Sequence, residues 1–233
     1  MTASPLGEII VFAPKFDTAT EYSFEWGKNL IGKFSEEITT LLETDATQRN
    51  FLKAISEHDI FIFFDHGIDD GLIDQNKRKF IYVGNAGILK NKRVYAMACL
   101  SAKELGVKAY HEGCLEYWGA TDAITFTIDD AHLFGEVYVD GAYARFGEGK
   151  PIKEVYQSMK DHFISQKAKT NNPWTKIWLQ KDRDMWVVWY DEDAPEPERP
   201  KPWWVRLWEW LKNLIGLGVA EEQWFDPIMC LYI

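Results

Sequence analysis

Two residues suited to nucleophilic catalysis follow short apolar segments of this sequence. His66 comes just after the run 59–64, and Cys99 directly follows the run 93–98. A cysteine attacks a carbonyl as its thiolate, and a nearby histidine can take the proton. Continuous apolar runs are typical of buried parallel strands, and function collects at the carboxyl ends of such strands. We therefore expect a candidate dyad at one edge of a sheet, although on pattern alone a cysteine packed in the core is an equally good interpretation.

The segments that must position these two residues alternate in type along the chain. Apolar runs predict strands at 8–13, 38–42, 59–64, 93–98 and 116–120, and the run 80–83 fits an edge strand or one arm of a hairpin. The segments between these runs have apolar residues at helical spacing, which predicts helices. Thr18 and Glu21 match a capping box, the pattern that begins a helix. This alternation predicts an α/β fold with a mostly parallel central sheet and helices on both faces.

The composition changes near residue 170. We predict a domain of residues 1–170 and a C-terminal extension of residues 171–233 packed on it. The extension contains a strand candidate at 185–190, an acidic proline-rich linker, and a Trp-rich amphipathic helix, Trp203–Ile215. The favoured role of this helix is packing on the sheet. The alternatives are a membrane interface, a regulatory protein partner, or a tail that covers the active site.

Composition limits the partners and the compartment that we expect. The net charge of -10 argues against nucleic-acid binding, which needs basic clusters. No apolar run is long enough for a transmembrane segment, and the first residues do not match a signal peptide. The three cysteines, Cys99, Cys114 and Cys230, form neither a disulfide framework nor a zinc ligand set. Free thiols favour a reducing compartment, so we predict a cytoplasmic protein.

The order of these motifs resembles the caspase-like superfamily of cysteine peptidases (clan CD). This group includes caspases, metacaspases, gingipains, clostripain, legumain, separase and bacterial CHAT domains. His66-Gly67 and Ala98-Cys99 match the His-Gly and Ala-Cys that the family places after successive strands, and Tyr117–Thr121 resembles the following strand of gingipain-like and CHAT proteins. The match spans roughly residues 8–167 and is closest to gingipain-like, CHAT and metacaspase-type prokaryotic members. It implies a caspase-like three-layer sandwich.

The resemblance also implies a reaction. Cys99 would attack the scissile carbonyl of a peptide or protein substrate, His66 would handle the protons, and the amides of Gly67 and Cys99 would stabilise the oxyanion. The product of this step is a thioacyl-enzyme, and no cofactor or metal is expected. The segment Met97–Ser101 lacks the Arg and Gly that flank the nucleophile in caspases proper. A caspase-type preference for acidic substrates is therefore not expected.

Several acidic residues are candidates for substrate binding. Some relatives bind an arginine side chain with a carboxylate, so Asp122 is a candidate for selecting a basic P1 residue. Asp65 is a second candidate; it could also orient His66, but simple exposure is the favoured interpretation. The patch Asp69, Asp70 and Asp74 does not have the spacing of a calcium loop and is interpreted as a solvated loop. The alternative functions are a non-catalytic caspase-like interaction or regulatory module and, less favoured, an unrelated α/β enzyme with a core cysteine.

Overall fold

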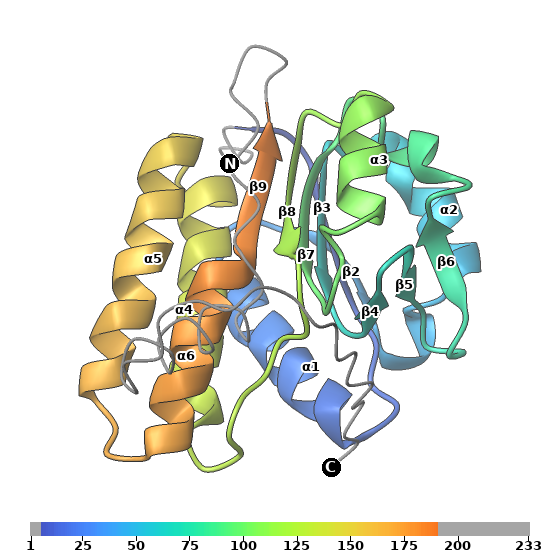
Figure 1. Cartoon of the computed structure of the whole chain (residues 1–233). Coiled ribbons are helices and arrows are strands. Elements are labelled where there is room, and N and C mark those ends of the chain that lie inside the picture. The colour runs from blue at the N-terminus through green and yellow to red at the C-terminus, as the bar shows by residue number, and fades with distance from the viewer. Residues whose placement is uncertain (1–5, 191–233) are drawn as a thin grey trace, which may run out of the picture. The chain divides into compact units, whose positions relative to one another are not determined.

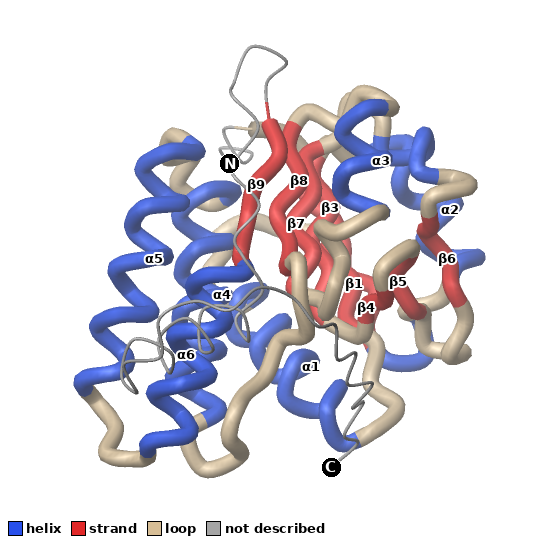
Figure 2. Tube along the Cα trace, in the orientation of Figure 1, coloured by secondary structure: helices blue, strands red, loops and turns tan. Residues whose placement is uncertain are grey.

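A central sheet of six strands organises the molecule. The structure is a computed structural model that describes residues 6–190 (Figures 1 and 2). The strand order is β2-β1-β3-β7-β8-β9. The strands are β1 (Ile9–Ala13), β2 (Thr39–Leu42), β3 (Ile60–Phe64), β7 (Arg93–Met97), β8 (Glu116–Ala120) and β9 (Trp186–Tyr190). Every neighbouring pair is parallel except β8 and β9, so the predicted mostly parallel sheet is confirmed.

Helices cover both faces of this sheet. They are α1 (Thr18–Ile31), α2 (Gln48–Ala54), α3 (Leu105–His111), α4 (Ala131–Phe146), α5 (Ile152–Ala168) and α6 (Pro173–Met185). Figure 1 shows α4, α5 and α6 on one side of the sheet and α2 and α3 on the other. The α/β class with flanking helices on both faces is therefore as predicted from the sequence.

Alternate residues of each central strand enter two separate cores. In β3, Ile60, Ile62 and Phe64 join the core under α1, α4, α5 and α6. Phe61 and Phe63 join the core under α2 and α3. Because successive side chains of a strand point to opposite faces, a sheet covered on both faces needs a continuous apolar run rather than an alternating one. This requirement explains why all five residues of β3 are apolar.

A small antiparallel sheet follows the histidine. It consists of β4 (Gly67–Ile68), β5 (Gly71–Ile73) and β6 (Lys79–Tyr82), paired in that order. The apolar run predicted at 80–83 is thus a hairpin arm and not an edge strand of the central sheet. Phe80 and Ile81 are buried in the core under α2 and α3, which attaches this small sheet to the main one.

The predicted start of the first helix is wrong by one residue. Asp17, not Thr18, is the N-cap of α1. The Asp17 carboxylate accepts a hydrogen bond of 2.9 Å from the Thr20 amide, and the Thr20 hydroxyl accepts one of 2.9 Å from the Asp17 amide. A capping box needs a cap and a partner three positions later, and Asp17 with Thr20 fulfils this spacing as well as Thr18 with Glu21 does. This shift matters because it places the Asp17 carboxylate beside the candidate site.

Residues 171–190 contribute to the same central sheet. Helix α6 packs on α5, and β9 pairs with β8 along its whole length. The strand predicted at 185–190 is present as β9, whereas the predicted helix Trp203–Ile215 lies outside the described residues. Within residues 6–190, no helix is both long enough and apolar enough to cross a bilayer.

Candidate active site

Strand register places His66 and Cys99 at the same level of the sheet. Strands β3 and β7 are parallel neighbours, and Phe64, the last residue of β3, pairs with Met97, the last residue of β7. The Asp65 amide extends this pairing by donating to the Met97 carbonyl at 3.3 Å. His66 lies two positions after Phe64, and Cys99 lies two positions after Met97. Since neighbouring strands lie about 4.8 Å apart, both residues emerge next to each other at the carboxyl edge, as the sequence predicts.

A sharp turn follows Cys99. Leu100 has a φ of 58°, in the left-handed region that leucine rarely adopts. Its amide donates to the Asp122 carbonyl at 3.1 Å, and the Ser101 hydroxyl donates to the Ala98 carbonyl at 2.9 Å. These bonds, made by the segments after β7 and β8, hold a backbone conformation that costs about 1 kcal/mol or more. Strain of this kind is common beside reacting groups because it turns the chain away and leaves one side chain at the strand end.

Gly67 lies directly against the backbone of Cys99. A Cβ atom at this position would be 2.4 Å from the Cys99 carbonyl oxygen and 2.9 Å from the Ala98 Cβ. Any other residue would force the two segments apart, so the glycine is required by close approach of the two backbones. The His66-Gly67 and Ala98-Cys99 motifs are therefore in contact in the folded chain.

The two candidate catalytic residues border one pocket. Its volume is about 140 Å³. The lining residues come from segments that follow β1, β3, β7 and β8: Ala19, Thr20, Ser23, Trp26, Asp65, His66, Met97, Ala98, Cys99, Ile124 and Phe126. The walls are mainly apolar, and Trp26 and Phe126 meet edge to face with ring centroids 5.1 Å apart. Four parallel strands thus deliver their C-terminal residues to one site, as expected in an open α/β sheet.

Asp17 holds the His66 ring, although no sequence pattern marked this residue as part of the site. The His66 Nε2 atom is 2.9 Å from the Asp17 Oδ2 atom, and both side chains are about two-fifths exposed. Partial burial acts to raise the pKa of Asp17, but hydrogen bonds from the Thr20 amide and the His66 ring lower it below its ordinary value. An ionised carboxylate on one ring nitrogen orients the imidazole. The one sequence signal was an acidic residue at the start of α1, after the first strand.

The expectation that Asp65 is exposed is wrong. Asp65 is only 5 % exposed, and its side chain reaches the pocket that His66 and Cys99 border. Its Oδ1 atom accepts a hydrogen bond of 2.5 Å from the His66 amide, whereas its Oδ2 atom is buried with no hydrogen-bond partner among the described residues. Burial raises the pKa of Asp65 to about 9, and the charges of Asp17 and Asp74 add to this effect. Asp65 is therefore a neutral carboxylic acid at pH 7.

The Cys99 sulfur is held by the backbone of Ile124. The Ile124 amide donates to Sγ at 3.3 Å, and the thiol donates to the Ile124 carbonyl at 3.9 Å. Burial is the largest influence on the thiol and raises its pKa, and Asp182 adds to the increase, although the Ile124 amide and Lys181 oppose it. Within residues 6–190, no hydrogen bond joins the His66 ring to this sulfur. The structure therefore presents a protonated, half-buried thiol beside the histidine and not an ion pair with it.

Asp122 does not line this pocket. Its carboxylate accepts a hydrogen bond of 2.7 Å from the Ala123 amide, and its carbonyl accepts the one from Leu100. The residue helps to shape the turn after Cys99. Of the two acidic candidates for substrate binding, the structure thus places Asp65 in the pocket wall and Asp122 outside it.

The predicted acidic patch has its own partners. Asp69 pairs with Lys103 at 2.6 Å, and Asp70 pairs with Lys79 at 2.7 Å. Asp74 is buried, which differs from the solvated loop that was expected, and it accepts hydrogen bonds from three backbone amides, those of Gln48, Asn76 and Arg78. In the described part of the chain, no group of three or more His, Cys, Asp or Glu residues is placed to hold a metal ion.

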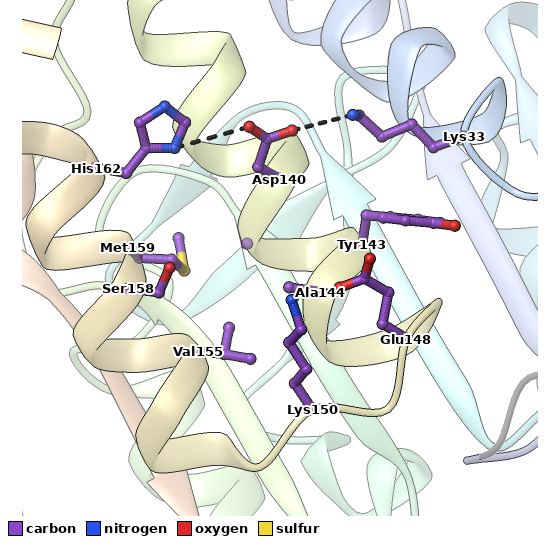
Figure 3. A pocket seen from close by; sticks show the side chains of 11 residues that line it. Lys33, Asp140, Tyr143, Ala144, Glu148, Lys150, Val155, Ser158, Met159 and His162 are labelled. Carbon is purple, nitrogen blue, oxygen red and sulfur yellow. Dashed lines mark ion pairs between the residues drawn. The ribbon is translucent and has the colours of Figure 1, made fainter. Parts of the chain in front are cut away.

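A second pocket, of about 320 Å³, lies between α4 and α5 (Figure 3). Figure 3 shows Asp140 between the side chains of Lys33 and His162. The Asp140 carboxylate lies 3.1 Å from the Lys33 Nζ atom and 3.8 Å from the His162 Nδ1 atom. Glu148 and Lys150 form another ion pair of 2.7 Å in this pocket. The charges are thus matched within the pocket, and none of the candidate catalytic residues lines it.

Comparison with known proteins adds no relative: no protein-family model matches the chain, and no curated protein matches its sequence.

Proposed function

We propose that this protein is a cysteine endopeptidase with a caspase-like fold, in which Cys99 is the nucleophile and His66 the general base. The observation that carries the proposal is the register of β3 and β7, which brings both residues to one pocket. The contact between Gly67 and the Cys99 carbonyl supports it, because it joins the two motifs on which the family resemblance depends.

The proposed reaction follows from these positions. His66 takes the proton of the Cys99 thiol, and the sulfur attacks the scissile carbonyl carbon. The amides of Gly67 and Cys99 are the proposed donors to the oxyanion. The tetrahedral intermediate collapses to a thioacyl-enzyme when the leaving amine takes the proton from His66. Water, deprotonated by the same ring, then releases the acid and restores the thiol. Asp17 holds the ring and stabilises its protonated form, as the 2.9 Å hydrogen bond supports.

The proposed substrate has a basic P1 side chain. The pocket has mainly apolar walls that suit a long aliphatic stem, and among the described residues Asp65 is the one acidic residue that lines it. Its Oδ2 atom has no hydrogen-bond partner among the described residues, and because this atom is buried, a guanidinium or ammonium group would have to open the pocket wall to reach it. A cation there would stabilise the ionised form of Asp65, whose pKa of about 9 results from burial. Asp65 therefore replaces Asp122 as the residue that we propose to select the substrate.

Peptide cleavage tests this proposal. Peptides with Arg, Lys or Asp at P1 are incubated with the wild type and with Cys99→Ala, and we expect cleavage after Arg and Lys that the substitution abolishes. Cleavage that survives Cys99→Ala would remove the assigned nucleophile. Asp65→Asn should lower kcat/KM for the Arg peptide by about tenfold or more, the size expected for a lost charge-assisted hydrogen bond, whereas Asp122→Asn should change it less.

The alternative function remains a non-catalytic interaction module of the same fold. A folded protein that cleaves none of the peptides, and whose Cys99 is not labelled by a thiol-reactive peptide probe, would favour it. The compartment is also part of the proposal. Cys99 and Cys114 are free thiols in the structure, which supports a reducing compartment such as the cytoplasm.

A further inference from the structure

The loop between β8 and α4 (residues 121–130) crosses the candidate site and contacts its nucleophile. Ile124 is the residue that touches Cys99, with its amide 3.3 Å from Sγ. Phe126 packs on α1 against Tyr22 and Trp26, with ring centroids 5.2 and 5.1 Å apart. One side of this loop is therefore anchored to α1, above the pocket that Cys99 borders.

Helix α6 anchors the other side of the loop through a buried lysine. Lys181 is 6 % exposed, and its ammonium group donates to the Ala123 carbonyl at 2.5 Å and to the Thr125 hydroxyl at 3.0 Å. The neighbouring Asp182 is fully buried and accepts a hydrogen bond of 3.3 Å from the Thr125 amide. These bonds hold the residues on both sides of Ile124, so they determine where the Ile124 backbone lies relative to the sulfur.

A substrate needs the same space around the sulfur. Before attack, the scissile carbonyl carbon must come within about 3–3.5 Å of Sγ. The Ile124 amide nitrogen already lies at 3.3 Å from that atom. Either the loop moves or the carbonyl cannot approach from that side. We propose that Lys181 is a positioning residue that keeps the Ile124 backbone on Cys99 in the unliganded protein, and that substrate binding must displace this contact.

The inference depends on the proposed function only in taking Cys99 as the nucleophile, and thiol alkylation tests it without any peptidase activity. Iodoacetamide modifies the wild type and Lys181→Met, and mass spectrometry follows the peptide that contains Cys99. Removal of the Lys181 bonds should raise the population of the open loop, and with it the alkylation rate at pH 7.5, by about tenfold. Lys181→Arg keeps the charge and can still donate hydrogen bonds to the Ala123 carbonyl and the Thr125 hydroxyl. Its alkylation rate should therefore lie within about twofold of the wild type.

The pH profile separates positioning of the loop from the loss of a charge. The charged or titratable groups around Cys99 are Asp182 and Lys181 on α6, Asp122 in the loop, Tyr138 on α4, and Asp65 and His66 after β3. Thr125→Val removes the hydroxyl that accepts a hydrogen bond from Lys181, and it replaces none of these charged or titratable groups. Burial is the main reason for the raised pKa of the thiol, so this variant should move the midpoint of the alkylation profile to lower pH.

Lys176→Met, on the same helix, is the matched control and should alkylate like the wild type. The inference is overturned if Lys181→Met and Thr125→Val alkylate no faster than this control, or if the midpoint for Thr125→Val does not move. If Lys181→Met does not fold, Thr125→Val decides alone. If alkylation responds as expected but no peptide is cleaved, the proposed function fails and the positioning role of Lys181 stands.

Discussion

Asp17 and Asp65 act on His66 and its pocket through opposite protonation states. Asp17 is ionised and partly exposed, and it bonds the ring of His66. Asp65 is buried and neutral, and it bonds the amide of the same residue. The two carboxyl groups therefore differ in their roles at one histidine: the first holds the ring of His66, and the second lines the pocket in which we propose that a cationic side chain ionises it.

Asp17→Asn separates catalysis from helix capping. Asparagine caps helices as well as aspartate, so the free energy of unfolding should change by less than about 0.5 kcal/mol. The neutral amide cannot stabilise a protonated ring, and we expect kcat/KM for the Arg peptide to fall by about tenfold. Cleavage rates across pH 5–9 and urea unfolding measure the two effects. Asp140→Asn, which alters a similar exposed Asp–His pair in the second pocket, is the control; equal losses in both variants would contradict a specific role.

Asp65→Asn should flatten the pH dependence of stability. The unfolded pKa of an aspartate is about 3.9, and the folded pKa of Asp65 is about 9. The folded state therefore holds one more proton between these values. Stability contributed by this group is complete below the unfolded pKa and is lost as the pH rises towards 9. Each pH unit in this range lowers the free energy of unfolding by about 1.4 kcal/mol at most. Asp65→Asn should remove this contribution to the slope.

Urea unfolding at several pH values between 5 and 8 measures the slope for wild type and variant. Asp182, whose pKa burial raises to about 8, contributes a slope of the same sign in both proteins. An identical slope in wild type and Asp65→Asn would show that Asp65 is ionised in the folded protein.

At the scale of elements, the contact between β4 and the turn after β7 joins the two motifs. The central sheet aligns β3 with β7, but the small antiparallel sheet begins at Gly67 and leaves no space for a side chain beside Cys99. The pairing of β3 with β7 sets the level of the two residues along the sheet. The glycine sets how closely the two segments approach.

Gly67→Ala should therefore damage both stability and the site. The added methyl would lie 2.4 Å from the Cys99 carbonyl oxygen, and overpacking of this kind costs about 1–3 kcal/mol. Urea unfolding measures the loss, and Cys99 alkylation reports the disturbed turn. The control is Gly87→Ala, where the nearest atom to a new Cβ is 3.7 Å away. Equal stability of the two variants would contradict the close approach.

At the scale of the whole molecule, α6 and β9 complete the sheet and one core. Trp186 and Leu179 are fully buried, and β9 covers the edge of β8 along five residue pairs. Helix α6 also carries Lys181 and Asp182, which anchor the loop over Cys99. The residues just beyond the predicted boundary at 170 are therefore both structural partners of the sheet and neighbours of the site.

Truncation tests this integration. A chain that ends at Tyr190 keeps the six strands of the central sheet and should unfold cooperatively. A chain that ends at Asn172 loses α6 and β9, exposes the β8 edge and the core under it, and should aggregate or lack a cooperative transition. Circular dichroism during heating and size-exclusion chromatography compare the two. Cooperative unfolding of the shorter chain would instead support an independent domain that ends near residue 170.

The sequence by itself determined the six strands of the central sheet and the two candidate catalytic residues. The runs that form β3 and β7 are apolar throughout because both of their faces are covered, and this property can be read locally. His66 and Cys99 stand at the ends of those runs, so a parallel sheet was enough to predict that they meet. The α/β class follows from the same local patterns, since the strands are continuous apolar runs and the helices between them have apolar residues at helical spacing.

Only the tertiary structure decided the environment of these residues. Asp17 reaches His66 across 49 positions, and Lys181 reaches Ala123 across 58. Asp65 is buried while Asp122 lies outside the pocket, although both are acidic residues beside strand ends. Burial, pKa and hydrogen-bond partners depend on which distant segments pack against a residue, and local sequence patterns do not contain that information. The identity of the candidate catalytic residues was thus a local property, and their protonation and access are properties of the packed molecule.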